Sequence, residues 1–177
     1  MEPNNYTMKV TLIANISING RILVSDNPAH QLPEEAFAFY LKLAHQVGNL
    51  VIGRQTFQNF QEFPQAVKDL FKGIEILVLS NTPQEVEGYT YVNSPEQAIA
   101  YMAEKGINEI AIGGGIGTFN AFIAKDLVTD LYLNVSPILT GEGVFLGWNN
   151  SSNTAFELVT HKVKQGFLQL HLAKPKN

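Results

Sequence analysis

Strand-like and helix-like segments alternate along most of the chain. Runs of residues typical of buried strands occupy positions 10–14, 50–52, 74–79 and 107–112, and apolar residues recur every three or four positions in the segment that begins at Pro33. Parallel strands need a crossover connection, which is usually a helix. The alternation therefore predicts an α/β fold in which helices pack on a mainly parallel sheet.

Two further helices are marked by their boundary residues. Ser94 is a typical N-cap, Pro95 suits the first helical position, and Gln97 can reach back as in a capping box. Gly106 is expected to end that helix. The next helix is expected at 117–125, directly after three consecutive glycines.

The last part of the chain has a different pattern. A β-like run at 131–138 is followed by two more at 156–163 and 167–172, with a turn expected at Gln165-Gly166. Two strands joined by so short a turn must be antiparallel. The hairpin therefore predicts antiparallel strands at one edge, which makes the sheet mixed.

Composition excludes several classes of protein. The chain has no cysteine, which rules out disulfides, thiolate nucleophiles and Cys-ligated metals, and its four histidines show no metal-ligand spacing. A formal net charge of −4 argues against a general nucleic-acid binder. No apolar stretch approaches the roughly 20 residues of a membrane-spanning helix. We expect a flexible extension at 1–7, one domain at 8–177 and a cytoplasmic location.

Three of the strand-like runs end in residues suited to bind phosphate. Arg54 and Thr56 follow the second run, and Ser80 follows the third. The glycine-rich stretch 113–117 follows the fourth. Ligands of open α/β sheets bind beyond the carboxyl ends of the strands, where backbone N–H groups and helix dipoles favour anions. Arginine can hold a phosphate with two parallel hydrogen bonds.

The glycine-rich stretch has two interpretations that the sequence does not separate. Missing side chains let the backbone approach a pyrophosphate closely, but the same glycines also permit a tight strand-to-helix turn. The spacing does not match the Rossmann fingerprint, because Gly113 and Gly115 are followed by Thr118 in the third place. The chain also lacks the Gly-Lys-Ser/Thr of a Walker-type phosphate loop.

An acidic pair opens the helix that follows Pro33. Glu34 and Glu35 are most simply complements of the helix dipole. In the functional interpretation, Glu35 lies at the mouth of a pocket lined by Phe39, one turn further along the helix. A carboxyl group beside an apolar surface can keep its proton near neutral pH and act as a donor.

These blocks, in this order, resemble the dihydrofolate-reductase-like superfamily. The resemblance covers nearly the whole chain, from about position 8 to 172. It rests on the strand and Asn-Gly loop at 12–20, the Gly-Arg-x-Thr-aromatic block at 51–57, the strand end at 79–81 and the glycine motif at 112–115. It implies a three-layer fold with helices on both faces of a mixed, mainly parallel sheet and a C-terminal antiparallel hairpin.

By this resemblance the cofactor is NADPH. The residues that would hold its adenosine-side phosphates are Arg54, Thr56, Ser80 and Asn81, with Gly53 in the same block. The residues along the pyrophosphate would be Gly113, Gly114, Gly115, Ile116, Gly117 and Thr118, and those near the nicotinamide would be Ala14, Asn19 and Gly20. On the substrate side, the resemblance implies Glu35 as the substrate-binding and catalytic acid, together with His30, Gln31, Phe39 and Asn134.

Departures from true folate reductases favour another branch of the superfamily. The stretch 58–73 lacks the arginine that holds the glutamate tail of folate, His30 replaces an aromatic residue, and Asn134 stands where the family has a threonine. The segments 128–131 and 137–143 instead resemble the riboflavin-biosynthesis reductase domain and its bacterial relatives. That branch is commonly dimeric, which implies a homodimer.

The expected function is NADPH-dependent reduction of a small pterin- or pyrimidine-like heterocycle. The alternative is a non-catalytic module of the same fold that binds NADPH or another nucleotide. In both cases the expected partner is a small molecule, and not nucleic acid, a membrane or a metal ion.

Overall fold

The computed structural model describes residues 7–176 except for 26, 83, 149, 151 and 152. The expected extension at 1–7 therefore lies outside the described residues, apart from Thr7. Among the described helices, none is long and apolar enough to cross a membrane. No group of three or more acidic or histidine side chains within the described ranges could hold a metal ion.

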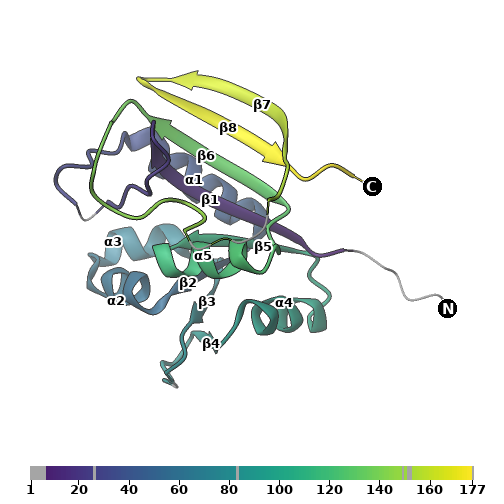
Figure 1. Ribbon diagram of the computed structural model, residues 1–177. Coiled ribbons are helices and arrows are strands. Elements are labelled where there is room, and N and C mark those ends of the chain that lie inside the picture. Colours follow the sequence, from purple (N-terminus) through teal and green to yellow (C-terminus); the bar gives the residue numbers. More distant parts are fainter. Residues whose placement is uncertain (1–6, 26, 83, 149, 151–152, 177) are drawn as a thin grey trace.

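One mixed sheet runs through the molecule, in the spatial order β4-β3-β2-β5-β1-β6-β8-β7 (Figure 1). Its strands are β1 (Lys9–Ser17), β2 (Asn49–Gly53), β3 (Glu75–Leu79), β4 (Thr90–Val92), β5 (Glu109–Gly114), β6 (Asp130–Ser136), β7 (Glu157–Lys164) and β8 (Phe167–Ala173). The strands from β4 to β6 pair in parallel, whereas β8 is antiparallel to β6 and to β7. The predicted mixed sheet and its C-terminal hairpin are confirmed.

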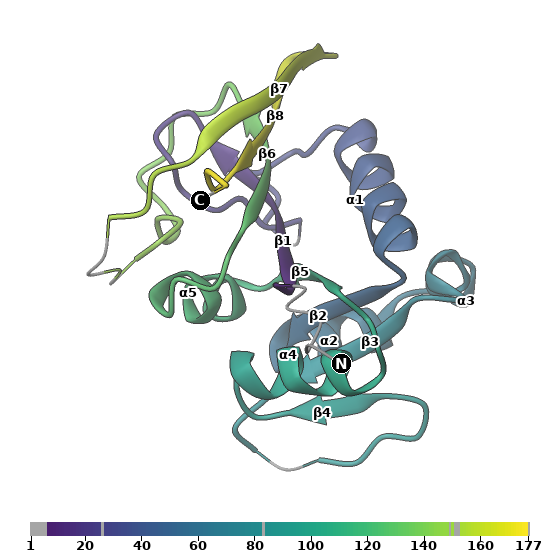
Figure 2. The same ribbon diagram turned by 90° about the vertical axis from the view of Figure 1, so that its right-hand side faces the viewer.

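Helices cover both faces of this sheet (Figure 2). They are α1 (Glu34–Val47), α2 (Arg54–Glu62), α3 (Gln65–Lys68), the short 3₁₀ helix η1 (Asp69–Phe71), α4 (Pro95–Glu104) and α5 (Ile116–Ala124). Buried residues of α1, α2 and η1 share one apolar cluster with one face of the sheet. Those of α4 and α5 share a second cluster with the other face. The predicted fold class, with helices on both faces, is confirmed.

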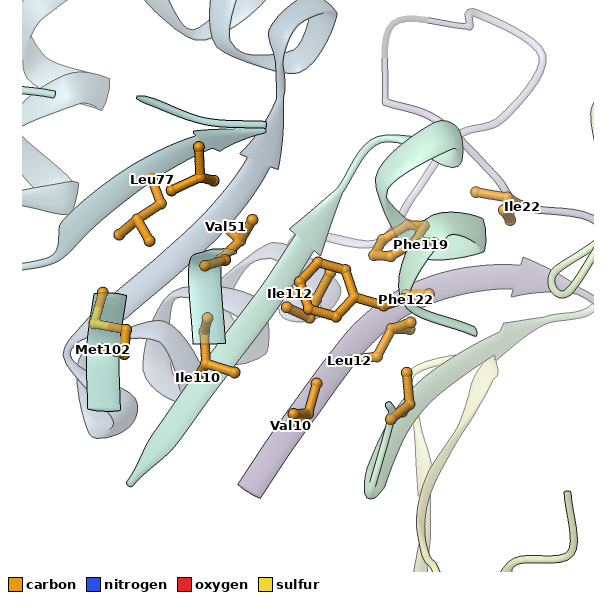
Figure 3. Packing of buried hydrophobic residues seen from close by; sticks show 14 of the residues in the cluster. Val10, Leu12, Ile22, Val51, Leu77, Met102, Ile110, Ile112, Phe119 and Phe122 are labelled. Carbon is orange, nitrogen blue, oxygen red and sulfur yellow. The ribbon is translucent and has the colours of Figure 1, made fainter. Parts of the chain in front are cut away.

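The cluster under α4 and α5 forms the larger core (Figure 3). Phe122 of α5 is fully buried, and so are Leu12 of β1 and Ile112 of β5. Alternate residues of one strand point to opposite faces, so Ile13 and Ala111 belong to the cluster under α1. Both faces of the central strands are buried, which explains why the sequence shows continuous apolar runs there.

Helix α1 begins and ends as its sequence dictates. Pro33 is the N-cap, and the acidic pair Glu34 and Glu35 occupies the first turn. The helix ends at Gly48, whose φ of 79° is left-handed and whose N–H donates to the carbonyl of Ala44. Gly48 thereby ends the helix one residue before β2 begins at Asn49.

Helix α4 confirms the predicted cap and corrects its detail. The Ser94 side chain accepts a hydrogen bond from the N–H of Gln97 at 3.1 Å. Gln97 Oε1 in turn accepts from the N–H of Asn93 at 2.6 Å. A capping box would use the N–H of Ser94, so Gln97 reaches one residue further back than expected.

Two parts of the fold differ from the expected strands and helices. The strand expected at 107–112 begins at Glu109, where its pairing with Lys9 of β1 starts, and continues to Gly114. The Asn49 side chain donates to the carbonyl of Glu109 and accepts from the N–H of Ala111. Strand β4 was not predicted, because three residues are too few to show a period.

Candidate functional site

The carboxyl ends of the parallel strands lie along one edge of the sheet. Strands β1, β2, β3, β5 and β6 end there at Ser17, Gly53, Leu79, Gly114 and Ser136. Each connecting helix runs back across the sheet, so α1, α2 and α5 begin at this edge. The spatial order changes direction on either side of β1, which is where ligands of open α/β sheets bind.

The ends of β2 and β5 are in close contact. A methyl group added to Gly53 would lie 2.6 Å from Thr118 Oγ1, and one added to Gly115 would lie 2.9 Å from Thr56 Oγ1. The pairing shifts here, with Val51 opposite Ile112 but Ile52 opposite Gly114. The extra residue brings the glycine-rich turn against the first turn of α2.

Two helix N-termini without side-chain caps meet at this contact. Gly53 is the N-cap of α2 and Gly115 is the N-cap of α5, and no side chain in the described part of the protein caps either helix. Their first-turn N–H groups are left for solvent or a ligand. Gly117, in the first turn of α5, has open space where a side chain would be. Two helix dipoles directed at one place favour a negatively charged group.

Arg54 connects this contact to the end of β3. Its Nη1 donates to Thr82 Oγ1 at 3.4 Å. Ser80 and Thr82 form a local turn, in which the Ser80 hydroxyl donates to the Thr82 carbonyl and accepts from the Thr82 N–H. Asn81 is exposed and makes no hydrogen bond within the described part of the chain. The three predicted phosphate loops therefore come together.

The loop after β1 is fixed to the segment before β7. The Ser17 hydroxyl donates to Asn19 Oδ1 at 2.7 Å, and Asn19 Nδ2 donates to the Thr140 carbonyl at 2.9 Å. Arg21 donates to the Gly143 carbonyl and lies 4.2 Å from the centre of the Phe145 ring. Gly20 forms the turn, with a φ of 80°. Ala14 is buried below, in the cluster under α5.

The residues around the start of α1 differ in exposure. His30 is buried, its Nδ1 accepts from the Val24 N–H at 3.4 Å, and its Nε2 has no hydrogen-bond partner among the described residues. Gln31 is exposed, whereas Glu35 is half-buried. Glu35 makes no hydrogen bond or ion pair with any described residue, so its carboxyl group is available to a ligand.

A cavity of about 120 Å³ lies between α1 and the last three strands. It is lined by Phe39, Tyr132, Thr160, Lys162, Gln169 and His171. The rings of Phe39 and Tyr132 are 5.7 Å apart, and burial raises the pKa of the Tyr132 phenol. Asn134 follows Tyr132 on the same face of β6 and is buried. A second cavity, of about 40 Å³, lies at the far end of α5 and is remote from the strand ends.

Gly113 has a packing role in the protein. A methyl group there would lie 2.3 Å from the Tyr40 hydroxyl oxygen and 2.6 Å from Leu50 Cδ1. The Tyr40 hydroxyl donates to the Gly113 carbonyl at 3.3 Å, and burial raises its pKa. The absence of a side chain at this position lets α1 lie close to β5.

Gly113→Ala is expected to lower the free energy of unfolding by about 1–2 kcal/mol, since the added methyl group overpacks the contact with α1. Urea denaturation measures the loss. Adding Tyr40→Phe should recover part of it, because the nearest atom in the way is the hydroxyl oxygen. Unchanged stability of the single variant would contradict this packing role.

Several residues at this edge were missed by sequence reasoning. Arg21 carries no motif, and Thr82 lies in the strand-end block that follows β3 but was given no role; contacts with distant segments fix both side chains. Gln169 and His171 do carry a signal, because they are the polar members of an alternating strand, 167–173.

Comparison with known proteins gives one family. A sequence model described as dihydrofolate reductase matches residues 9–165. The protein YwjB of Bacillus subtilis (strain 168), itself uncharacterized, is 26% identical over 173 residues, a match that covers 94% of this chain and 98% of YwjB.

Solved structures show the same fold. A putative riboflavin biosynthesis protein from Shewanella sp. PV-4 is 25% identical with a TM-score of 0.72, covering 96% of this chain and 100% of that one. A diaminohydroxyphosphoribosylaminopyrimidine deaminase/5-amino-6-(5-phosphoribosylamino)uracil reductase from Thermotoga maritima has a TM-score of 0.73 at 12% identity, covering 96% of this chain and 57% of that one. A pyrimidine reductase-like protein from Corynebacterium diphtheriae has a TM-score of 0.71 at 14% identity, covering 96% and 93%.

Proposed function

The chain belongs to the dihydrofolate reductase family, closer to the riboflavin-biosynthesis reductases, and we propose that it is an NADPH-dependent reductase of a small pterin- or pyrimidine-like heterocycle. The observation that carries the proposal is the meeting of two helix N-termini without side-chain caps, those of α2 and α5, beside Arg54. NADPH, when bound, supplies the hydride, and the protein supplies binding, orientation and proton handling.

The residues present fit a dinucleotide phosphate chain. The N–H groups that begin α2 and α5 carry no side-chain cap, and Gly117 leaves open space beside them. Together they provide donors for an anion without an intervening side chain. In this proposal the phosphates are held by Gly53, Arg54, Thr56, Ser80, Asn81, Gly113, Gly114, Gly115, Ile116, Gly117 and Thr118, with Ala14, Asn19 and Gly20 at the nicotinamide end.

On the substrate side, the proposal assigns proton delivery to Glu35. Glu35 is half-buried and lies in the first turn of α1, at the carboxyl edge of the sheet, and its carboxyl group makes no hydrogen bond with a described residue. Reduction of a C=N bond requires a proton as well as a hydride, and Glu35 can deliver it directly or through a water molecule. His30, Gln31, Phe39 and Asn134 complete the proposed substrate contacts.

Titration with NADPH, followed by assays of its oxidation, tests the proposal. We expect saturable NADPH binding and oxidation with a pterin or an aminopyrimidine acceptor, monitored by loss of cofactor absorbance. Binding without oxidation across a broad panel of such acceptors would favour the non-catalytic module of the same fold. Absence of NADPH binding would reject the reductase, and absence of binding to any nucleotide would reject the module as well.

The proposal extends to a homodimer and a cytoplasmic location. Strand β7 supports the dimer, because it is an edge strand with every residue exposed, including Leu158 and Val163. The cysteine-free composition is compatible with a reducing compartment. Sedimentation of the full chain, compared with a Val163→Lys variant, tests the dimer. A monomeric wild-type protein would exclude it.

A further inference from the structure

Three amide side chains form a hydrogen-bonded row across the sheet beneath α1. Gln169 of β8 donates from Nε2 to Asn134 Oδ1 at 3.1 Å. Asn134 of β6 donates from Nδ2 to Asn15 Oδ1 of β1 at 2.9 Å. The three residues are direct partners in the strand register, since Asn134 pairs with Asn15 on one side and with Gln169 on the other. We call these three residues the amide row.

The amide row has a direction. A primary amide has a donor end and an acceptor end, so orienting one member orients its neighbours. Here Gln169 and Asn134 both donate toward β1, which leaves Asn15 Nδ2 and Gln169 Oε1 without a partner among the described residues. Neither atom is among the buried polar atoms that lack a partner, so both reach solvent. The row therefore presents donors at Asn15 and an acceptor at Gln169.

Lys162 gives a physical reason for this direction. It is opposite Gln169 in the β7–β8 register and lines the same cavity. An ammonium group has three donors and no acceptor, so it favours the carbonyl end of Gln169 on its side. The Gln169 amide nitrogen is then left to donate to Asn134, which is buried and needs a partner for each end.

Asn15 is at the strand end where the proposed substrate binds. It precedes Ser17, the last residue of β1, by two positions and is only half-buried. Its side chain lies on the face of Ile13, which is the face covered by α1. Glu35 and Phe39 come from that same helix.

We propose that the amide row sets the hydrogen-bond polarity of the substrate site: Asn15 selects a heterocycle with a carbonyl oxygen over one with an amino group at the same position. Gln169 acts as a positioning residue, since it acts through Asn134 and Asn15. The proposal deepens the function given above and rests on it. A site that leaves a buried polar group unpaired disfavours the mismatched ligand by about tenfold or more.

A single substitution at the far end of the row tests this inference. In the Gln169→Glu variant, the ionised carboxylate has no donor and must accept from Asn134 Nδ2. Asn134 then turns its oxygen toward Asn15, and Asn15 in turn presents its oxygen to the site. The substitution leaves side-chain volume almost unchanged and places the new charge beside Lys162. Asn134→Asp reverses Asn15 by the same logic and serves as the second variant.

The probes are uracil, which has two carbonyl oxygens, and 2,4-diaminopyrimidine, which has amino groups in their place. Binding to the full chain is measured by calorimetry at an alkaline pH where both probes are uncharged. The orientation of Asn15 is read independently from its side-chain amide resonances in NMR spectra. Thr160→Glu is the matched control, because it adds a carboxylate to the same cavity without entering the amide row.

We expect wild-type protein and the Thr160→Glu control to prefer uracil by about tenfold, and the reversing variants to prefer the diaminopyrimidine. Equal binding of the two probes to wild type, or a preference that Gln169→Glu and Asn134→Asp leave unchanged, would overturn the proposal. So would a reversal in Thr160→Glu, since charge alone would then explain it. NADPH binding, measured separately, distinguishes these outcomes from failure of the reductase proposal.

Discussion

Replacement of Glu35 by glutamine lowers turnover by about 100-fold or more if this carboxyl group delivers the proton, the low end of the range for general acid catalysis. The amide cannot release a proton, but it has nearly the same size and can still form hydrogen bonds. The dissociation constant of NADPH should not change, because Glu35 lies in the first turn of α1, whereas the proposed phosphate loops lead into α2 and α5. Single-turnover oxidation of NADPH and equilibrium titration measure the two quantities separately.

Glu34 provides a matched control for this variant. It occupies the same first turn of α1, so Glu34→Gln removes the same favourable interaction with the helix dipole. Glu34 is exposed, however, whereas Glu35 is half-buried. The two variants should therefore lose similar stability, a few tenths to about 1 kcal/mol, while only Glu35→Gln loses turnover. Equal turnover in the two variants would remove Glu35 from the chemistry.

Most of the fold could be predicted because local and tertiary signals agree in its central strands. Apart from Thr11, the run 10–14 and the run 50–52 are apolar, since both faces of β1 and β2 are covered by helices. The turn at Gly166 and the cap at Ser94 are encoded by single residues whose conformational preferences do not depend on distant parts of the chain. The short strand β4 was missed because its pairing with β3 depends on contact rather than on pattern.

The candidate site could be predicted only in part, because its motifs mark the loops and not the contacts between them. The three loops proposed to bind phosphate were predicted from Arg54, Ser80 and the consecutive glycines, and the structure brings these loops together through Thr56 and Thr82. No local sequence pattern reveals that the Thr82 hydroxyl would accept a hydrogen bond from Arg54.

The amide row escaped prediction for a related reason. Asn15 and Asn134 are far apart in sequence, and Gln169 is on a strand that was expected to be a plain edge element. The three side chains meet because of the strand register, in which β6 lies between the parallel strand β1 and the antiparallel strand β8. The alternation of polar and apolar residues along the strand marks Gln169 as a polar position, but it does not identify the side chains on neighbouring strands that Gln169 contacts.

Arg54→Ala should weaken NADPH binding by about 1.5–3 kcal/mol, which is roughly a tenfold to hundredfold rise in the dissociation constant. A guanidinium group can form two charge-assisted hydrogen bonds to one phosphate, and alanine forms none. Arg54 is exposed, and the one hydrogen bond seen in the structure, to Thr82, is long at 3.4 Å. The side chain can therefore turn toward a phosphate without breaking a strong interaction.

Two further variants separate the hydrogen bonds of Arg54 from its charge. Arg54→Lys keeps the charge but loses the planar fork, so its dissociation constant should fall between those of wild type and Arg54→Ala. Lys42→Ala removes a positive charge from the exposed face of α1 and should leave NADPH binding unchanged. Loss of a phosphate contact also reduces the dependence of binding on salt. The dissociation constants of Arg54→Ala at low and high ionic strength should therefore differ less than those of the wild type. If Arg54→Ala and Lys42→Ala bind NADPH equally well, the phosphates lie elsewhere, and the meeting of α2 and α5 has a purely structural cause.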